Sequence, residues 1–377
     1  MKKFWSITTF FGLIFSNQLF AIDNIPEEDH ECTSWMVLHD LTKNNTNILH
    51  KNRDDVARDI AVFLSPAASP RKWIALGTDI PTNMALNASG LAGVMNSGET
   101  CIDPPTDNTK KRTPEMMRVI MNSCDTAAQA VAKLQELHKA GDYWHAGGSG
   151  SIFLFLDRNE GYICEMTAKV MTVTSYKEGV ALRANIWQNP GMSKYARKSA
   201  AGYLNSSARA WITMSGLNKV FDQNGKITLS DIFALSRTCN VPETSAIKGC
   251  VCFTKTNSSA TLEIDRQYPD VLSSGYFAIG HPRHTVYLPV PVCVEKILPQ
   301  MGDYSWSKAV WARFDKLGFE SPIPEKWLEF EKKSMEKYTA AKEEARKLLD
   351  QGKRADAVKL INSAAAEIWS AAVELLR

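Results

Sequence analysis

The chain has 377 residues, of which 44% are hydrophobic and 23% are charged, and its formal net charge is +3. This length allows one large domain or two ordinary ones, with enough apolar material for a sizeable core. The basic residues are scattered and follow no zinc-finger or phosphate-loop spacing, so the composition gives no basis for a nucleic-acid partner.

Residues 1–21, MKKFWSITTFFGLIFSNQLFA, have the pattern of a signal peptide. Lys2 and Lys3 precede an apolar run that is too short to cross a membrane, and the segment ends at the small residue Ala21. No later segment of the sequence reaches the length of a transmembrane helix. These features predict an exported protein, secreted or periplasmic, without a membrane span.

Residues 22–31, IDNIPEEDHE, carry five acidic residues and no lysine or arginine. A short acidic stretch between a signal peptide and the first strand pattern is typical of a removable leader. We therefore interpret it as an acidic propeptide that ends directly before Cys32.

Strand patterns start at Thr33. Segments 33–41 and 46–54 flank the turn-forming cluster Thr-Lys-Asn-Asn and predict a hairpin. Further β-rich segments, separated by glycine and asparagine turns, are 72–80, 83–98 and 150–187.

Helices are predicted in the middle of the chain. One runs from Thr113 to about Lys139, because Thr-Pro-Glu at 113–115 places a cap residue, a proline and an acidic side chain at its start. Two more are predicted in 194–240, the second opened by the capping pattern Thr-Leu-Ser-Asp at 228–231.

Strand patterns return at 259–267 and 274–292, and the tail 324–377, rich in Ala, Glu, Lys and Leu, predicts two helices broken near 350–354. The order of strands, helices, strands and helices predicts an α+β fold in which helices cover antiparallel sheets. We assign 32–323 to this domain and 324–377 to C-terminal helices, whose charged surface is a candidate for homo-oligomer formation.

Export would make disulfides possible, and the chain has eight cysteines. Apart from Cys32 they are irregularly spaced, at 101, 124, 164, 239, 250, 252 and 293. Cys250 and Cys252 have one residue between them, whereas redox and zinc motifs have two. We expect these seven to be scattered buried thiols with a bridge or two.

Cys32 has three interpretations. A lipid-anchor cysteine would directly follow the apolar signal segment, whereas Cys32 lies eleven residues beyond Ala21. A disulfide cysteine is the ordinary expectation in an exported chain. A nucleophilic cysteine needs a base, because the thiolate is the attacking species. If the mature chain began at Cys32, its own α-amine, with an ordinary pKa of about 7.7–8, would be that base.

The stretch ECTSWMVLHDLTKNNTNILHKNRDD, residues 31–55, resembles the start of N-terminal-nucleophile (Ntn) hydrolases of the linear-amide branch. This branch includes choloylglycine hydrolases, penicillin V acylases, isopenicillin-N acyltransferase-like enzymes and related cysteine dipeptidases. Its members begin with Cys and small or hydroxyl residues, followed by a hairpin with an Arg-Asn-x-Asp motif on its second strand. Here that motif reads Lys-Asn-Arg-Asp, at 51–54.

Further motifs follow in the order seen in this group, and the resemblance covers about residues 32–292. ALNASGLAGVMNSGE at 85–99 resembles the stretch whose later asparagine, here Asn96, helps to form an oxyanion hole. LRANIW at 182–187 resembles the strand end that supplies another active-site asparagine, here Asn185.

Two more segments resemble the group. SIFLFLDRNEGYICEMT at 151–167 resembles a strand pair that ends in Asp157 and Glu165, which we interpret as structural strand-end residues. SGYFAIGHPRHTVYLPVPV at 274–292 resembles the late strand pair of dipeptidase-like members. We interpret its His-Pro-Arg-His at 281–284 as a polar hairpin turn and not as a metal site.

The resemblance implies an αββα sandwich, in which two stacked antiparallel sheets lie between helical layers. It implies that Cys32 attacks the substrate carbonyl, that Asn96 and Asn185 stabilise the oxyanion, and that Asp54 holds the α-amine.

The resemblance also implies a basic residue that keeps the thiolate favoured. The group has arginine at the first position of the motif, whereas this chain has Lys51, and Arg53 lies two residues further on. Lysine keeps the charge but lacks the planar fork of arginine. Whether Lys51 or Arg53 is the basic residue beside the thiolate therefore stays open.

We predict from these residues a hydrolase that cuts a linear amide bond through a thioester at Cys32, after cleavage of the Glu31–Cys32 bond, without a metal or other cofactor. The expected partners are small-molecule amides or short peptides, with a small peptide, an aminoacyl amide or an N-acyl amide as substrate, and the late strands favour a small peptide or aminoacyl amide. The alternatives are an acyltransferase with an amine acceptor, a catalytically silent exported binding protein on the same fold, and a conventional cysteine protease with a Cys–His pair.

Overall fold

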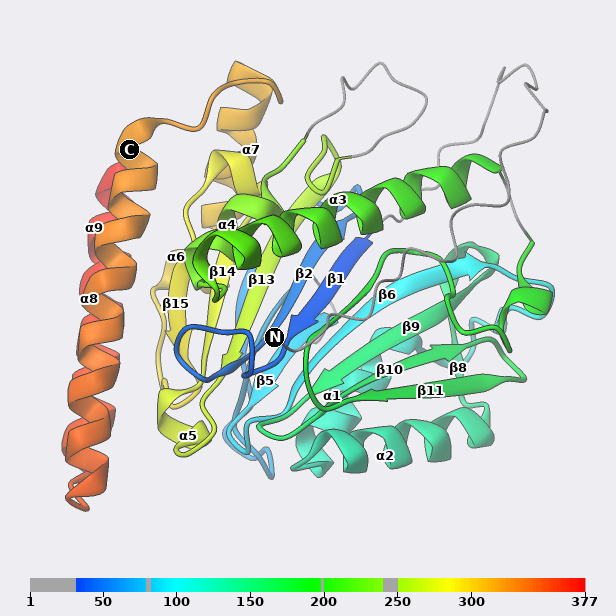
Figure 1. The fold of residues 1–377 in the computed structure, drawn as a ribbon, viewed down its shortest axis with the longest axis horizontal. Helices are drawn as coiled ribbons and strands as arrows, with labels where there is room; N and C mark the ends of the chain where they lie inside the picture. The colour runs from blue at the N-terminus through cyan, green and yellow to red at the C-terminus, as the bar shows by residue number, and fades with distance from the viewer. Residues whose placement is uncertain (1–31, 79–82, 198–199, 240–249, 377) are drawn as a thin grey trace.

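The computed structural model describes residues 32–78, 83–197, 200–239 and 250–376. The predicted signal peptide and propeptide, residues 1–31, lie outside these ranges. The described chain forms two antiparallel β-sheets stacked between layers of helices (Figure 1). Within the described ranges, no helix combines the length and the apolar character that crossing a membrane requires.

The first sheet has six strands in the order β12-β1-β2-β13-β14-β15. The predicted hairpin is confirmed, because β1 and β2 pair along their length, from Cys32 opposite Arg53 to Val37 opposite Ile48. The strands are β1 (Cys32–Val37), β2 (Asn47–Asp54), β12 (Val180–Arg183), β13 (Thr256–Ile264), β14 (Ser274–Ile279) and β15 (Leu288–Pro291).

The second sheet has seven strands in the order β11-β10-β9-β6-β5-β4-β3. The turn between β9 and β10 is the Asp-Arg-Asn-Glu segment at 157–160, in which the Asp157 carboxylate accepts from the backbone N–H groups of Asn159 and Glu160. The strands are β3 (Ala61–Leu64), β4 (Trp73–Gly77), β5 (Met84–Asn87), β6 (Ala92–Thr100), β9 (Ser149–Leu156), β10 (Gly161–Met166) and β11 (Met171–Tyr176), and a separate short pair is β7 (Lys111–Arg112) with β8 (Tyr143–Trp144).

The alternation of side chains along β1 and β2 decides which residues lie between the sheets. Met36 and Leu49 belong to the apolar layer that the two sheets share. Trp35 points to the opposite face and packs with the helices. Since successive side chains of a strand point to opposite faces, Cys32 and Lys51 lie on the inner face with Met36.

Helices cover the outer faces of both sheets. α1 and α2 pack on the second sheet, and α3 and α4 pack on the first, which gives the predicted αββα order of layers (Figure 1). The helices are α1 (Thr113–Ser123), α2 (Ala127–Ala140), α3 (Ala200–Asn224), α4 (Leu229–Ser236), α5 (Pro269–Leu272), α6 (Pro299–Gly302), α7 (Ser305–Leu317), α8 (Glu325–Asp350) and α9 (Arg354–Leu376).

Local capping corrects one helix prediction and confirms another. The single helix predicted from 113 to 139 is in fact two, because Thr126 caps a new start and its side chain accepts from the Gln129 N–H. The capping pair Thr228 and Asp231 is present at the start of α4, as the sequence predicts.

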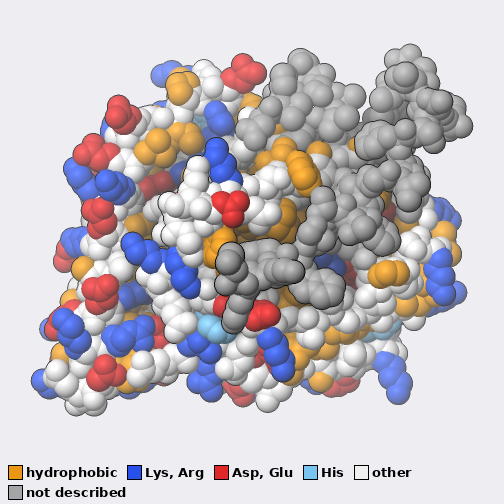
Figure 2. Space-filling model, in the orientation of Figure 1, with side chains coloured by type: hydrophobic (Ala, Val, Ile, Leu, Met, Phe, Trp, Pro, Cys, Tyr) orange, Lys and Arg blue, Asp and Glu red, His pale blue; other side chains and the backbone are white. Residues whose placement is uncertain are grey.

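The predicted C-terminal helices form a long antiparallel pair, α8 and α9, beside the edge strand β15 (Figure 1). Trp369 on α9 anchors the pair by donating from Nε1 to the carbonyl oxygen of Pro289, at 2.7 Å. Figure 2 shows acidic and basic side chains interspersed over this part of the surface.

The cysteines are mostly buried thiols, as expected. Cys239 and Cys250 form a disulfide. The free and buried cysteines of the described residues are Cys32, Cys101, Cys124, Cys164, Cys252 and Cys293.

The segment 281–284 lies in the connection between the antiparallel strands β14 and β15, as the sequence predicts, but it is buried. It contains a 3-10 turn in which the rings of His281 and His284 lie 5.3 Å apart, and both rings contact Phe314 of α7. The burial arises because α7, a helix outside the motif, covers the turn with aromatic side chains.

A buried histidine on β2 makes the stability of this fold depend on pH. His50 stacks on Trp35 and contacts the hydroxyl of Thr261 at 2.7 Å. Burial lowers the pKa of His50 from 6.5 to about 3, and a hydrogen bond with Asn52 opposes this shift. The unfolded chain therefore binds a proton near pH 6.5 that the folded chain does not accept until near pH 3.

We expect neutral, buried His50 to stabilise the folded state fully above about pH 6.5. This stabilisation should be lost as the pH falls from about 6.5 towards about 3. Urea unfolding of the wild type and the His50→Gln variant, measured at several pH values between about 7.5 and 4.5, checks this expectation. The stability of the variant should fall less steeply with acid than that of the wild type. Parallel slopes would contradict it.

Candidate functional site

Cys32 is the first residue of β1 and borders a cleft of about 550 Å³. Its side chain is 95% buried, so a reactant reaches it only through this cleft. The lining residues come from both sheets and from the segments around α1 and β8: Cys32, Lys51, Arg53, Asp54, Asp55, Asn83, Met95, Ser97, Arg112, Pro114, Trp144 and His145.

The Lys51 ammonium is buried between the sheets beside the Cys32 thiol. Its Nζ donates to the carbonyl oxygen of Met95 at 2.7 Å and to Asn96 Oδ1 at 2.8 Å, and it also hydrogen-bonds Cys32. Burial lowers the pKa of Lys51 below its usual value, and the attraction and hydrogen bond of Cys32 oppose that shift. All three ammonium donors have acceptors, which fixes the cation near the sulfur.

Arg53 lies directly opposite Cys32 in the β-ladder, but its guanidinium pairs with Asp55. Its Nη2 donates to the Asp55 carboxylate at 2.7 Å. Of the two basic residues that the sequence left open, Lys51 is therefore the one that the structure places against the thiol, while Arg53 forms part of the cleft wall.

Asn96 on β6 ties the second sheet to the first. Its Oδ1 accepts from Ser34 Oγ at 2.7 Å as well as from Lys51, and its Nδ2 donates to the carbonyl oxygens of Arg183 and Ala184, at 3.2 and 3.5 Å. The predicted oxyanion role of Asn96 stays a prediction, and the structure shows the side chain as the polar bridge that holds Lys51.

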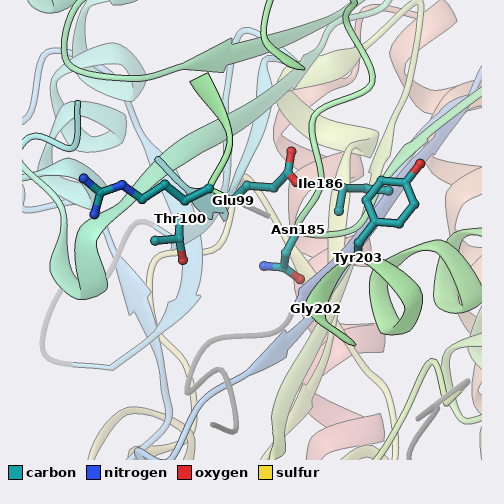
Figure 3. Close-up of a pocket in the computed structure, with 7 residues that line it drawn as sticks. Glu99, Thr100, Asn185, Ile186, Gly202 and Tyr203 are labelled. Carbon is teal, nitrogen blue, oxygen red and sulfur yellow. The ribbon is translucent and has the colours of Figure 1, made fainter. Parts of the chain in front are cut away.

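Asn185 follows β12 and lies against the backbone nitrogen of Cys32. Its Oδ1 accepts from the backbone N–H of Cys32 at 2.6 Å, and its Nδ2 donates to the carbonyl oxygen of Ser97 at 3.0 Å. Asn185 also borders a second hollow, of about 220 Å³, next to Glu99 and Tyr203 (Figure 3). It therefore stands between this hollow and the Cys32 cleft.

Arg209 on α3 is a site residue that the sequence did not reveal. It is fully buried, and its Nη1 donates to the carbonyl oxygen of Cys32 at 2.6 Å and to Thr33 Oγ1 at 3.0 Å. Its Nη2 donates to Asn185 Oδ1 at 3.0 Å. Because an arginine can only donate, it fixes the Asn185 amide with the oxygen towards Cys32. An arginine within an otherwise ordinary helix carried no motif that would have identified it.

Asp54, the last residue of β2, borders the same cleft as Cys32. Its Oδ1 accepts from Thr256 Oγ1 at 2.6 Å. Its negative charge raises the pKa of Lys51 against the dominant effect of burial, which places the carboxylate in the electrostatic environment of the site. The predicted contact of Asp54 with the α-amine stays a prediction, since the described Cys32 N–H donates to Asn185.

His145 also lines the cleft, and its Nε2 contacts Ser97 Oγ at 3.0 Å. It is the residue that a conventional Cys–His mechanism would have to use. Among the described residues there is no group of three or more His, Cys, Asp or Glu side chains that could hold a metal ion.

The site therefore combines a thiol, a fixed ammonium beside it, and a backbone nitrogen held by an amide oxygen that a guanidinium orients. A thiol beside a cation is favoured as thiolate, the form that attacks carbonyl carbon. The Cys32 nitrogen lies at the same place as the thiol, so a free amine there would lie within reach of the same reacting atoms.

No family model and no curated protein sequence matches this chain. Several solved structures are similar to it, including the following three. A mutant conjugated bile acid hydrolase from Clostridium perfringens is 10% identical, with a TM-score of 0.47, over 71% of this chain and 95% of that one. Penicillin V acylase from Agrobacterium tumefaciens is 11% identical, with a TM-score of 0.47, over 69% of this chain and 86% of that one.

The third is the Caenorhabditis elegans orthologue of N-acylethanolamine-hydrolyzing acid amidase, 11% identical, with a TM-score of 0.41, over 64% of this chain and 94% of that one. All three are Ntn hydrolases, the group that the sequence motifs resemble. At these identities and scores the likeness concerns the chain trace, and the chemistry has to come from the site itself.

The position of Lys51 predicts its effect on the nucleophile. In the Lys51→Met variant the thiolate loses its neighbouring cation, so iodoacetamide should alkylate Cys32 at least about tenfold more slowly at neutral pH. Mass spectrometry of the peptide that contains Cys32 gives the rate separately from the other cysteines. Lys72→Met, at an exposed lysine paired with Glu295, is the matched control and should leave the rate unchanged. Equal rates in both variants would refute the role of Lys51.

Proposed function

We propose that this protein is a cysteine Ntn hydrolase that cleaves a linear amide bond through a thioester at Cys32. The observation that carries the proposal is the convergence on one residue of Lys51 at the thiol and Asn185 at the backbone nitrogen. An ordinary buried cysteine needs neither contact. The signal-peptide pattern of residues 1–21 supports export, to the periplasm or the exterior.

Maturation would cleave the Glu31–Cys32 bond and turn the Cys32 nitrogen into an α-amine. The acidic leader 22–31 supports this step from the sequence. The new amine would keep Asn185 Oδ1 as acceptor, and the positive charge of Arg209 close by favours the neutral amine. A neutral amine is the form that can take a proton from the thiol.

In the proposed reaction, the Cys32 sulfur forms a bond to the substrate carbonyl carbon, and the α-amine takes the thiol proton. The tetrahedral intermediate collapses as the carbon–nitrogen bond breaks, and the amine returns the proton to the leaving nitrogen. Water then attacks the thioester, delivers a proton to the amine, and releases the acid and the thiol. With an amine in place of water, the same intermediate would give acyl transfer.

The oxyanion of this intermediate needs fixed donors, and each is worth about 10²–10³ in rate. The amide nitrogens of both predicted asparagines already donate: Asn185 Nδ2 to the carbonyl oxygen of Ser97, and Asn96 Nδ2 to those of Arg183 and Ala184. We assign the donor roles to these two nitrogens, each of which would have to exchange its present contact for the substrate oxygen.

The charges around the cleft favour a polar substrate. Arg53, Asp55 and Arg112 place both signs of charge in its lining, next to the Trp144 ring. A long apolar acyl chain would desolvate these groups without pairing them, at a cost, whereas a short peptide or aminoacyl amide carries complementary charges. This supports a small peptide or aminoacyl amide over a lipid-like N-acyl amide.

Substrate comparison tests this preference. A dipeptide should be hydrolysed with a kcat/KM at least about tenfold above that of a long-chain N-acyl amide, because the long chain would remove water from the charged side chains of the cleft without adding a polar contact. A steady-state assay of both substrates at equal enzyme concentration gives the ratio. A ratio below one would contradict the preference for a polar substrate, without bearing on the role of the Cys32 thiol.

Intact-mass measurement of the purified mature protein is the first test of the mechanism. We expect the chain to begin at Cys32. The Cys32→Ala variant should lose amide hydrolysis by at least about 10³-fold, since the nucleophile is gone. A mature chain that retains the leader, or an active Cys32→Ala variant, would contradict the proposal.

A histidine variant separates the two thiol mechanisms. His145→Gln should keep activity within about tenfold of the wild type if the α-amine is the base. Loss comparable to that of Cys32→Ala would instead support a conventional Cys–His protease. Wild-type protein that begins at Cys32 but neither hydrolyses amides nor forms an adduct with a thiol-reactive acyl analogue would support the binding-protein alternative.

A further inference from the structure

We propose that Glu165 is a positioning residue for Asn185, and that through Asn185 it sets the reactivity of the Cys32 nitrogen. The inference rests on the proposed function. Glu165 lies on β10, the second strand from one edge of the second sheet, and has no contact with Cys32 among its hydrogen bonds. The sequence suggested only a structural strand-end residue at this place.

The Glu165 carboxylate is buried and holds the segment 183–189 at both ends. At one end, its Oε1 accepts from Arg183 Nε at 2.6 Å. At the other, Oε1 accepts from the backbone N–H of Gln188 at 2.9 Å, and Oε2 from that of Asn189 at 3.0 Å. Asn185 lies between these two anchors.

Two further contacts close the same segment. Arg183 Nη1 donates to Gln188 Oε1 at 2.9 Å, so the two ends also bind one another. The Trp187 N–H donates to Glu99 Oε2 at 3.1 Å. The backbone around Asn185 is thus held as a loop, with Glu165 binding both of its ends and Glu99 binding Trp187 within it.

A carboxylate is required for this arrangement, because all of its hydrogen-bond partners are donors. Glutamine at position 165 would keep the shape, but its NH₂ group cannot accept a hydrogen bond, and its neutral oxygen would leave Arg183 buried without a counter-charge. The loop would lose its fixed geometry, and Asn185 would move relative to the Cys32 nitrogen. Misplacement of about 1 Å in such a group costs about 10² in rate.

The protein offers a matched control outside the cleft. Glu331 on α8 is buried, pairs with Arg237 through both carboxylate oxygens at 2.6 and 2.7 Å, and accepts from the backbone N–H of Tyr287 at 2.6 Å. Glu331→Gln therefore removes the same kind of interaction as Glu165→Gln. A general loss of stability would affect both variants, and a positioning role would affect only one.

The experiment compares wild type, Glu165→Gln, Glu165→Asp and Glu331→Gln as purified mature protein. The first readout is the rate of Cys32 alkylation by iodoacetamide as a function of pH, followed by mass spectrometry, together with the thermal unfolding midpoint. The second readout is kcat and KM for a dipeptide. In Glu165→Gln we expect the midpoint of the pH–alkylation curve to move by about half a pH unit or more. Its kcat should fall about 10- to 100-fold with little change in KM.

Glu165→Asp keeps the charge and should have a kcat between those of Glu165→Gln and the wild type. If Glu165→Gln does not fold, Glu165→Asp is compared with the wild type in its place. Glu331→Gln should have a different unfolding midpoint from the wild type but the same pH–alkylation curve. If Glu165→Gln and Glu331→Gln behave alike, or Glu165→Asp matches Glu165→Gln, the positioning role is overturned. If the wild type hydrolyses no amide, the proposed function fails, and the alkylation curves still decide the role of Glu165.

Discussion

The buried Lys51 ammonium is the constraint on which this site depends. A cation between two apolar sheet faces is costly unless its donors are satisfied, and its partners come from both sheets: Met95 and Asn96 from the second, Cys32 from the first. The same contacts that stabilise the charge therefore set how the sheets stack at this end. Structural and chemical roles are inseparable here, because moving either sheet would uncover the cation and remove it from the thiol.

A second chain of contacts approaches the nucleophile from the other side. Arg209, from the helical layer over the first sheet, orients Asn185, whose loop Glu165 holds from the second sheet. The Cys32 backbone N–H donates to the Asn185 Oδ1 that these contacts place. The α+β sandwich thus brings α3, the segment after β12 and β10, far apart in sequence, together behind the first residue of β1. This is what an N-terminal nucleophile needs, since its thiol and amine are on the same residue.

Features that depend on neighbouring residues were predictable. The β1–β2 hairpin follows from alternation around a turn cluster, and the start of α4 follows from the capping pair Thr228 and Asp231. Ordered motifs brought Cys32, Lys51 and Asn185 into one proposed site, and the structure brings them together. The break between α1 and α2 was missed, although the capping residue Thr126 was visible, because the apolar periodicity continues on both sides of it.

The sequence by itself determined the α+β class and the local hairpin and helix starts, because periodicity and capping are local properties, and the family resemblance of its ordered motifs implied the layer order and the polar residues grouped around Cys32. Only the tertiary structure decided that Lys51 and not Arg53 contacts the thiol, since Asp55 pairs with Arg53. It alone revealed Arg209, and it alone buried His281 beneath α7. Each of these depends on which distant element packs against a side chain, and a buried charge or ring is placed by those partners.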